Sequence, residues 1–346
     1  MVRRKSKSRK KRRSGAGVLL LVIVLLGLFA AAGVGWLIFA PYGPQNETFV
    51  ELDPGSSTQL IGRKLEDAGV VRSQFAFDLL RLVERKRLKA GEYRFDHPAP
   101  VTEVYERIAR GDVFTISLTI PEGANIFDVA ARVEQAGFGT REAFLLAAKE
   151  QTGLVADIDP AAKTLEGYLF PDTYRFARKA TPAHIAAAMV HRFRVVADQL
   201  GLKENVHTVV TVASLVERET AIDTERPLVA SVFENRLTKK MPLMTDPAVI
   251  YGLELDSRWT GVLHKSDLAY NTPYNTYLHG GLPPGPVANP GIRSLRAAMS
   301  PASTDYLYFV AAGSDAQGAS LFSRSLAEHN RNVSGYRKAV KRAGAR

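Results

Sequence analysis

The sequence predicts an α+β protein with a single N-terminal transmembrane helix, a small βααβ module and a larger mixed α/β domain. Three observations predict this fold class: one long uncharged apolar run, a strand–helix–helix pattern that occurs twice, and a later series of helical stripes broken by Gly/Pro-rich loops. The length of 346 residues suits two modest domains or one large domain with an appendage. The hydrophobic content of 46% means that most of the chain should fold.

A transmembrane helix is predicted over residues 15–40, after a basic tail over residues 1–14. No charged residue lies between Arg13 and Glu47. As a helix, the run would extend about 39 Å at ~1.5 Å per residue, enough to cross a hydrocarbon core of ~30 Å with some tilt. Trp36 near its far end is typical of a membrane interface. A cleaved signal peptide stays open as an alternative, because "FAAAG" offers small residues, although the run is long for such a segment.

The positive charge is concentrated in the basic tail. Nine of its residues are cationic, and without them the net charge of +11 falls to +2. These nine are Arg3, Arg4, Lys5, Lys7, Arg9, Lys10, Lys11, Arg12 and Arg13. A nearly neutral folded part gives no support to a nucleic-acid partner. The positive-inside rule places the N-terminus in the cytoplasm and everything after Pro41 outside.

A short linker over residues 41–47 leads into the small module over residues 48–115. Pro54 and Gly55 mark a turn after the strand "TFVEL", and an apolar stripe at helical spacing follows. The same strand–helix–helix pattern returns about one module later, with Pro54 and Pro121 offset by 67 residues. Such small modules usually bind or position something rather than catalyse.

The larger domain is predicted over residues 116–338, followed by a basic C-terminal tail over 339–346. One helix begins at a Thr-Pro start signal, "TPAHIAAAMVHRF", and two others read "NVHTVVTVASLVERETA" and "ERPLVASVFENRL". The segment "YNTPYNTYLHGGLPPGPVANPG" is too long and too rich in Gly and Pro for a simple linker. Ordered loops of that size are usually functional.

Two carboxylates end the apolar helix "VHTVVTVASLVERE". At ~100° per residue, Glu217 falls on the apolar face, Arg218 points outward, and Glu219 falls at the opposite border of the arc, about 160° from Glu217. In a cleft, desolvation would raise the pKa of Glu217 and suit it to act as a general acid. A buried Glu217 satisfied by an arginine or by backbone donors stays open as the alternative. Glu219 is interpreted as a boundary or ion-pair residue.

Other chemistries lack a local signature. The sequence has no cysteine, which excludes disulfides, thiolate zinc sites and cysteine nucleophiles. It has no HExxH zinc motif, no phosphate-binding glycine loop and no GxSxG elbow. Carboxylates, amides and aromatic residues around Gly/Pro loops remain, and this inventory is typical of a carbohydrate site.

Six motifs in order resemble the MltG, or YceG-like, family of endolytic murein transglycosylases. They are "LEGYLFPDTY", "ASLVERET", "VASVFENRL", "MPLMTDPAVIYGL", "YNTYLHGGLPPGPVANPG" and "EHNRNV", and the resemblance covers roughly residues 48–335. It implies a LysM-like character for the module over 48–115 and a YceG-like catalytic domain after it. It also implies a single-pass protein of the bacterial inner (cytoplasmic) membrane, with the catalytic domain in the periplasm or otherwise outside the cytoplasm.

The resemblance implies a lyase that cleaves the β-1,4 bond between N-acetylmuramic acid and N-acetylglucosamine without water, forms a 1,6-anhydro end and terminates nascent glycan strands. The family's catalytic acid is matched to Glu217. Candidate substrate-binding residues are Thr245, Asn275 and Tyr277, with Glu166 and Asp246 as second candidates. Peptidoglycan strands are the expected partner and peptidoglycan synthases a further candidate, with no cofactor and no metal.

One departure from the family pattern lies near the C-terminus, where "GASLFS" carries Ser320 at the position of a family histidine. Two other functions stay open. One is a scaffold that binds peptidoglycan without cleaving it. The other is a muramidase that hydrolyses the same bond with a second carboxylate such as Asp246.

Overall fold

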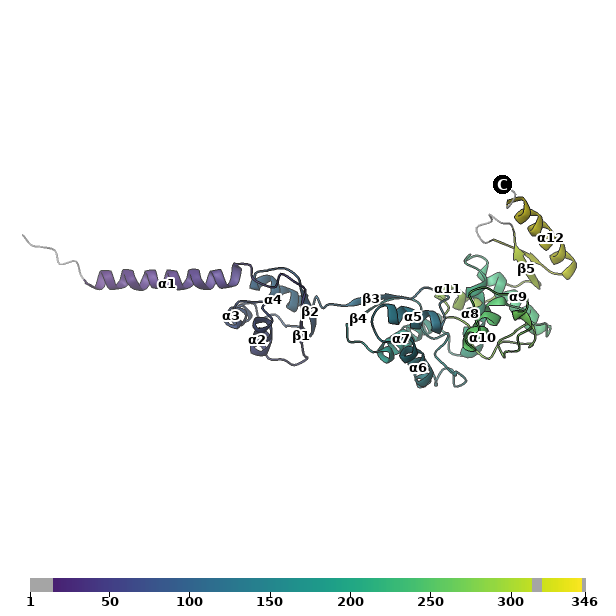
Figure 1. Cartoon of the computed structure of the whole chain (residues 1–346), viewed down its shortest axis with the longest axis horizontal. Helices are drawn as coiled ribbons and strands as arrows, with labels where there is room; N and C mark the ends of the chain where they lie inside the picture. Colours follow the sequence, from purple (N-terminus) through teal and green to yellow (C-terminus); the bar gives the residue numbers. More distant parts are fainter. Residues whose placement is uncertain (1–14, 313–318, 344–346) are drawn as a thin grey trace, which may run out of the picture. The chain divides into compact units, whose positions relative to one another are not determined.

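The computed structural model describes residues 15–312 and 319–343, and it divides into two compact units, residues 1–115 and 116–346 (Figure 1). The basic N-terminal tail and the last residues of the C-terminal tail lie outside the described residues. Within the described part, helices and short strands are mixed, and one apolar helix lies near the N-terminus. The predicted mixed α/β class with a single such helix is therefore confirmed at this level.

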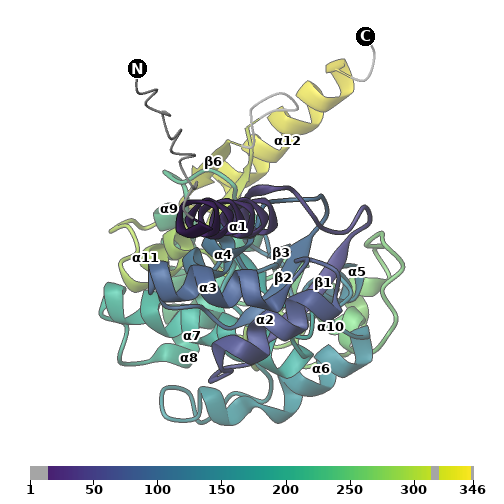
Figure 2. The same ribbon diagram turned by 90° about the vertical axis from the view of Figure 1, so that its left-hand side faces the viewer.

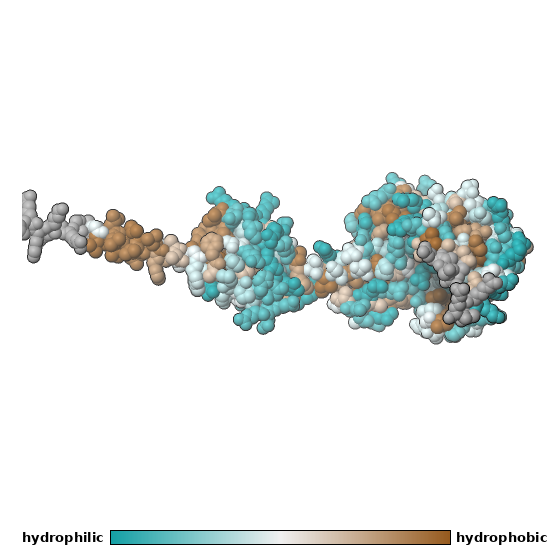
Figure 3. All heavy atoms as spheres, turned by 90° about the horizontal axis from the view of Figure 1, so that it is seen from above, coloured by the Kyte–Doolittle hydropathy of each residue, from teal (hydrophilic) through white to brown (hydrophobic). Residues whose placement is uncertain are grey.

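Helix α1 (Gly15–Phe39) is long and apolar enough to cross a membrane by its length and composition. Figure 3 shows it as a continuous brown rod, because its side chains are apolar on all faces. A helix that is apolar all round fits a lipid environment better than water. Residues 41–47, predicted as a linker, are bonded to the module, since Tyr42 and Ala99 exchange backbone hydrogen bonds of 3.1 and 3.0 Å.

The rest of the first unit has the order strand, helix, helix, strand, helix. The elements are β1 (Thr48–Leu52), α2 (Thr58–Asp67), α3 (Gln74–Glu84), β2 (Gly91–Phe95) and α4 (Val101–Arg110). Strands β1 and β2 pair antiparallel, with Val50 opposite Tyr93. Both helices of the pair begin at a serine whose hydroxyl accepts a backbone N–H, Ser57 for α2 and Ser73 for α3.

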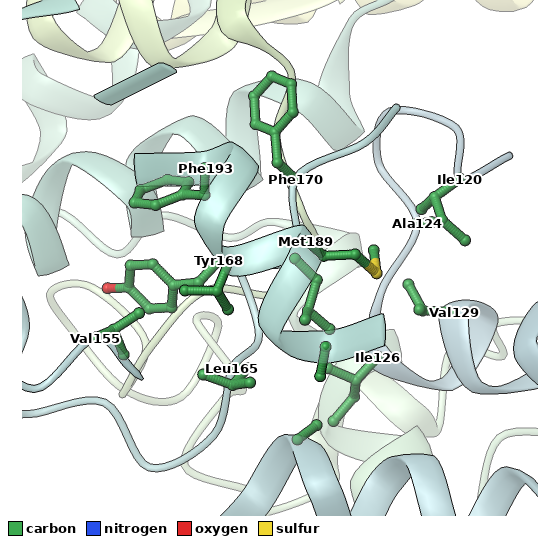
Figure 4. Close-up of a cluster of buried hydrophobic side chains, with 14 of the residues drawn as sticks. Ile120, Ala124, Ile126, Val129, Val155, Leu165, Tyr168, Phe170, Met189 and Phe193 are labelled. Atoms are coloured by element: carbon green, nitrogen blue, oxygen red, sulfur yellow. The ribbon is translucent and has the colours of Figure 1, made fainter. Parts of the chain in front are cut away.

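The second unit begins by repeating the strand–helix–helix pattern. Its first elements are β3 (Ile116–Thr119), α5 (Ile126–Gln135), α6 (Arg141–Glu150), β4 (Thr173–Phe176) and α7 (Pro182–Leu200). Strands β3 and β4 pair antiparallel. Helix α7 starts as predicted, with Thr181 as its N-cap and Pro182 in its first turn. Figure 4 shows the core of this half, where the rings of Tyr168 and Phe193 pack edge to face at 5.1 Å.

The remaining elements carry the carboxylates of interest. They are α8 (Val206–Glu219), α9 (Arg226–Thr238), α10 (Asp246–Leu255), α11 (Ile292–Met299), β5 (Tyr308–Ala311), β6 (Ser320–Ser323) and α12 (Leu326–Ala343). Helix α8 lies between two core clusters, with Val210 and Ala213 in one and Leu215 and Val216 in the other. Packing on both sides fixes this helix, so the side chains of its last turn have defined directions.

Candidate functional site

A cavity of about 360 Å³ opens at the C-terminal end of α8. Its walls come from α8, α9, the start of α10, β5 and α12. It contains three of the predicted substrate-binding residues, Thr245, Asp246 and Tyr277. The other lining residues are Glu219, Phe233, Arg236, Leu243, Met244, Tyr308, Phe309, Leu326 and His329. Carboxylates, phenols and apolar side chains therefore converge on one concave surface, which is typical of a binding site.

The predicted polar residues of the cavity are held by their own loop. Thr245 is buried at the N-cap of α10, and its backbone N–H donates to the hydroxyl of Thr276 at 2.9 Å. Asp246 follows as the first residue of α10, and its carboxylate accepts a 2.6 Å hydrogen bond from the phenol of Tyr277. Burial and this bond raise the pKa of Tyr277, so its phenol stays protonated at physiological pH and acts as a donor.

Asn275 does not line this cavity. Its side chain is buried, and its amide nitrogen donates to the carbonyl oxygens of Leu268 and Tyr270 at 3.0 and 2.8 Å. Its carbonyl oxygen accepts the backbone N–H of Tyr277 at 2.9 Å. Asn275 therefore fixes the loop that presents Tyr277.

Glu219 is the carboxylic acid of α8 that faces the cavity. Burial raises the pKa of Glu219 to about 7, and the nearby charge of Asp246 acts in the same direction. The negative end of the α8 dipole also disfavours a carboxylate at this last helical residue. In the described part of the chain, no hydrogen bond or ion pair engages its carboxyl group. A carboxylic acid whose pKa is raised towards neutral pH and whose carboxyl group faces a cleft is suited to general acid catalysis.

Glu217 has a different environment. Its side chain is only 5% exposed, and its carboxylate forms a 2.8 Å ion pair with Arg226, which is equally buried. Its other oxygen accepts the backbone N–H of Gly291 at 2.9 Å. Glu217 thus links α8 to the starts of α9 and α11. This arrangement matches the alternative that the sequence left open, a buried glutamate satisfied by an arginine and a backbone donor.

Glu122 is a further acid near Glu217. It comes from the loop between β3 and α5, and its carboxyl group occupies the space where a Cβ at Gly291 would lie. Burial raises the pKa of Glu122, and the charge of Glu217 adds to the shift. Neither residue lines the cavity that holds Glu219 and Tyr277.

Glu166 lies apart from this cavity. It is almost fully buried, and its carboxyl oxygens accept from the backbone of Ile126 at 2.9 Å and from the amide of Asn289 at 3.0 Å. Burial raises the pKa of Glu166 to about 8. It lines a smaller cavity of about 190 Å³ together with Tyr251 and Tyr274. The structure does not bring Glu166 together with the other predicted residues.

Two basic residues of the cavity, Arg236 and His329, are among the lining residues that the sequence analysis did not predict. Arg236 donates to the carbonyl oxygens of Leu307 and Leu243 at 2.7 Å each, and its guanidinium lies over the ring of Tyr308 at 5.2 Å. His329 stacks on the same ring with centroids 5.2 Å apart, and its buried Nδ1 has no partner among the described residues. His329 belongs to the motif "EHNRNV", and this position within a family motif could have identified it as a candidate site residue.

Ser320, which stands at the position of a family histidine, begins β6 and donates its backbone N–H to Glu225 at 2.7 Å. Residues 313–318, just before it, lie outside the described residues. No cluster of three potential metal ligands occurs over residues 15–312 and 319–343.

Comparisons with known proteins point in one direction. The sequence profile of the YceG-like family matches residues 50–335. The chain is similar to the endolytic murein transglycosylase of Bacillus subtilis (strain 168), with 33% identity over 322 residues, covering 86% of this chain and 87% of that protein. It is similar to the protein of the same name from Streptococcus pneumoniae (strain ATCC BAA-255 / R6), with 30% identity over 319 residues.

The chain spans 57% of the streptococcal protein, which is therefore longer than this chain. A crystal structure of a yceG-like protein from Listeria monocytogenes is also similar, with 30% identity and a TM-score of 0.54. That match covers 83% of this chain and 99% of the Listeria chain.

Proposed function

This chain belongs to the YceG-like family, and we propose that it is an endolytic murein transglycosylase whose general acid is Glu219. The enzyme is a lyase that acts on the glycan strands of peptidoglycan. The choice of acid rests on one observation, the position of Glu219 in the cavity with Asp246 and Tyr277. There, burial and the charge of Asp246 raise the pKa of Glu219 to about 7.

The proposed reaction needs one proton-carrying group. Protonated Glu219 donates its proton to the glycosidic oxygen while the bond from that oxygen to C1 of N-acetylmuramic acid breaks. The C6 hydroxyl of the same sugar bonds to C1 and gives its proton to the Glu219 carboxylate. The products are a 1,6-anhydro end and a free 4-hydroxyl, with no water consumed and the acid regenerated. The nucleophile belongs to the substrate, so a second catalytic carboxylate is not needed.

Asp246 and Tyr277 support this acid without exchanging protons with the substrate. The charge of Asp246 helps to keep Glu219 protonated. Tyr277 fixes the Asp246 carboxylate through their 2.6 Å hydrogen bond and adds an aromatic surface to the wall. Aromatic side chains provide stacking surfaces for sugar rings, which supports a subsite at this wall.

Glu217 is proposed to hold the site together. Its ion pair with Arg226 and its bond to Gly291 connect three helices beside the cavity. These contacts occupy both carboxyl oxygens of Glu217, which lies outside the lining of the Glu219 cavity. The sequence-based prediction that Glu217 is the acid stays a prediction, and a matched pair of substitutions distinguishes the two glutamates.

The test compares Glu219→Gln with Glu217→Gln on purified, peptide-free glycan strands, with products identified by mass spectrometry. We expect Glu219→Gln to retain the fold and to lose anhydro ends by at least ~100-fold. We expect Glu217→Gln to retain measurable activity and to lower the unfolding temperature, because buried Arg226 then keeps only the exposed Asp223 as a counter-ion.

Several results would contradict this proposal. Full activity of Glu219→Gln beside an inactive, folded Glu217→Gln would return the role of the acid to Glu217. Products heavier by one water would identify a hydrolase, and binding of glycan with no new ends at any protein concentration would identify a scaffold.

We propose that α1 anchors the enzyme in the cytoplasmic membrane with its N-terminus inside and the second unit outside. The length and apolar surface of α1 support the span, and the basic residues over 3–13 support the orientation. A LysM-like role for the module over 48–115 would give the enzyme a second contact with glycan. Termination of nascent strands and association with peptidoglycan synthases belong to the same proposal.

A further inference from the structure

Helix α3 of the first unit has two apolar faces. Its inner face packs into the module core through Ala76 and Phe77, both at most 1% exposed. Its outer face carries Phe75, Leu82 and Val83, which are 60, 70 and 70% exposed. Their spacing of seven and eight residues places them within an arc of about 100° on one side of the helix. A surface helix normally keeps only one apolar stripe, so this outer face needs a covering partner.

The same helix is held against the end of α1. Arg72, one residue before the N-cap of α3, donates to the carbonyl oxygen of Pro41 at 3.2 Å. Its guanidinium lies over the rings of Trp36 and Tyr42, at 4.2 and 4.7 Å from their centroids. Leu37 and Ile38 of α1 pack against the core of the module. Figure 2 looks along α1 and places α3 and α4 beside it, and α1 is in contact with both helices.

These contacts set the height of α3 relative to a membrane. Helix α1 has 25 residues. At ~1.5 Å per residue it extends about 37 Å, against a hydrocarbon core of ~30 Å. The last turns of α1, which carry Trp36, therefore emerge at the interface, and the helix that packs against them lies at the same depth. In Figure 1, α3 lies at the end of the module next to α1.

A run of positive charge continues from the outer face. Residues 81–89, "RLVERKRLK", contain five basic residues and one acidic residue. Arg85, Lys86 and Arg87 are exposed at the C-terminal end of α3. Exposed leucine, valine and phenylalanine beside arginine and lysine make up the composition of helices that lie in the interface of an anionic bilayer.

We infer that α3 is a membrane-surface helix, whose outer face of Phe75, Leu82 and Val83 inserts into the outer leaflet of the membrane that α1 spans. Lys86 is paired with Glu84 and Glu106, and Lys89 donates to the carbonyl oxygen of Arg110, so the cations that contact anionic phospholipid headgroups are Arg81, Arg85 and Arg87. The module is thereby held flat on the bilayer. The inference rests on the proposed transmembrane role of α1, and the experiment separates the two.

The test uses the full-length protein in vesicles and exploits its lack of cysteine. An environment-sensitive fluorophore is attached to one introduced cysteine at a time: Leu82→Cys on the outer face, Leu26→Cys in the middle of α1, and Val113→Cys as the matched control. Val113 is an apolar residue of the same unit that is 37% exposed and lies outside α3. Quenching by brominated acyl chains is measured in phosphatidylcholine alone and with phosphatidylglycerol added.

We expect brominated lipid to quench the label at position 82 several-fold more than the label at position 113, with stronger quenching when phosphatidylglycerol is present. Strong quenching at 26 with equal, weak quenching at 82 and 113 would overturn the inference and leave the anchor intact. Weak quenching at 26 would overturn the anchor itself. Quenching at 82 that does not respond to phosphatidylglycerol would overturn the headgroup contact.

Efficient disulfide formation between two unlabelled copies of the Leu82→Cys variant at low protein density would overturn the lipid contact and show that a second copy covers this face.

Discussion

Glu217 and Glu219 are two residues apart on one helix, yet their carboxyl groups have different surroundings. Arg226 and a backbone donor occupy the carboxyl oxygens of Glu217, whereas Glu219 faces the cavity, and burial and the Asp246 charge raise its pKa. A general acid must carry a proton at the working pH and face the space that the substrate enters. The chemistry of each residue is therefore set by its contacts and not by the helix that carries it.

The first prediction concerns the pH dependence of the reaction. Because only protonated Glu219 can donate, the rate should fall as the pH rises through the pKa of about 7. Asp246→Asn removes a charge that raises this pKa, so the descending limb of the pH–rate profile should move to lower pH. The measurement is anhydro-end formation from glycan strands between about pH 5 and 9, a range that brackets this pKa.

Asp256→Asn is the matched control for this prediction. Asp256 accepts a 2.8 Å hydrogen bond from Tyr270 and does not line the cavity, so its removal should leave the profile in place. A limb that stays fixed in Asp246→Asn would show that Asp246 does not act on the acid. A shift towards higher pH would contradict the assignment of Glu219 as a proton donor.

Some residues of the candidate site could be predicted from the sequence alone. Thr245, Asp246 and Tyr277 were predicted from their motifs and lie in one cavity. Helical phasing placed Arg218 outward, and it is exposed. Phasing could not reveal the importance of Glu219, because the cavity wall beside it is built by β5 and α12, which are about a hundred residues further along the chain.

At the scale of the element, the segment before β4 is tightly packed against α8. Gly167 has a φ of +87°, and a Cβ there would lie 2.5 Å from Pro286 and 2.7 Å from Val210. Both neighbours are parts of rigid structure, since one is a proline and the other a buried residue of α8. We predict that Gly167→Ala lowers the free energy of unfolding by about 3 kcal/mol or more, measured by urea denaturation.

Gly201→Ala is the matched control for this element. Gly201 has a φ of +70° at the C-cap of α7, but an added Cβ would meet nothing within 4 Å. Its replacement should lower stability only by about 1 kcal/mol, the cost of the left-handed conformation alone. An equal decrease in the free energy of unfolding of the two variants would mean that the clash with Pro286 and Val210 does not destabilise Gly167→Ala.

Elements with strong local signals were predictable, and those built from distant contacts were not. Short stretches of sequence were enough to predict the Thr-Pro start of α7 and the repeated strand–helix–helix pattern. The structure contains both. The partner of β3 is β4, more than fifty residues away, and no local pattern specifies such a pairing. The outer face of α3 was likewise invisible, because apolar spacing alone does not say which side of a helix meets the core.

At the scale of the whole molecule, the two units divide the proposed work between them. The first unit carries the anchor and the membrane-surface helix, and every residue that lines the Glu219 cavity belongs to the second. Strand β3 begins at Ile116, directly after the division, and pairs with β4 of the same unit. A chain that starts at residue 116 therefore keeps its strand pairing and its own core.

We predict that residues 116–346, expressed without the first unit, fold in the absence of detergent and form anhydro ends on soluble glycan strands. The fragment should lose activity selectively on membrane-bound nascent strands, because the anchor that concentrates the enzyme there is gone. Circular dichroism checks the fold, and mass spectrometry of products from the two substrates checks the selectivity. A folded fragment that leaves soluble glycan uncut would mean that the first unit supplies part of the substrate site, whereas equal loss on both substrates would remove the role of membrane anchoring in the choice of substrate.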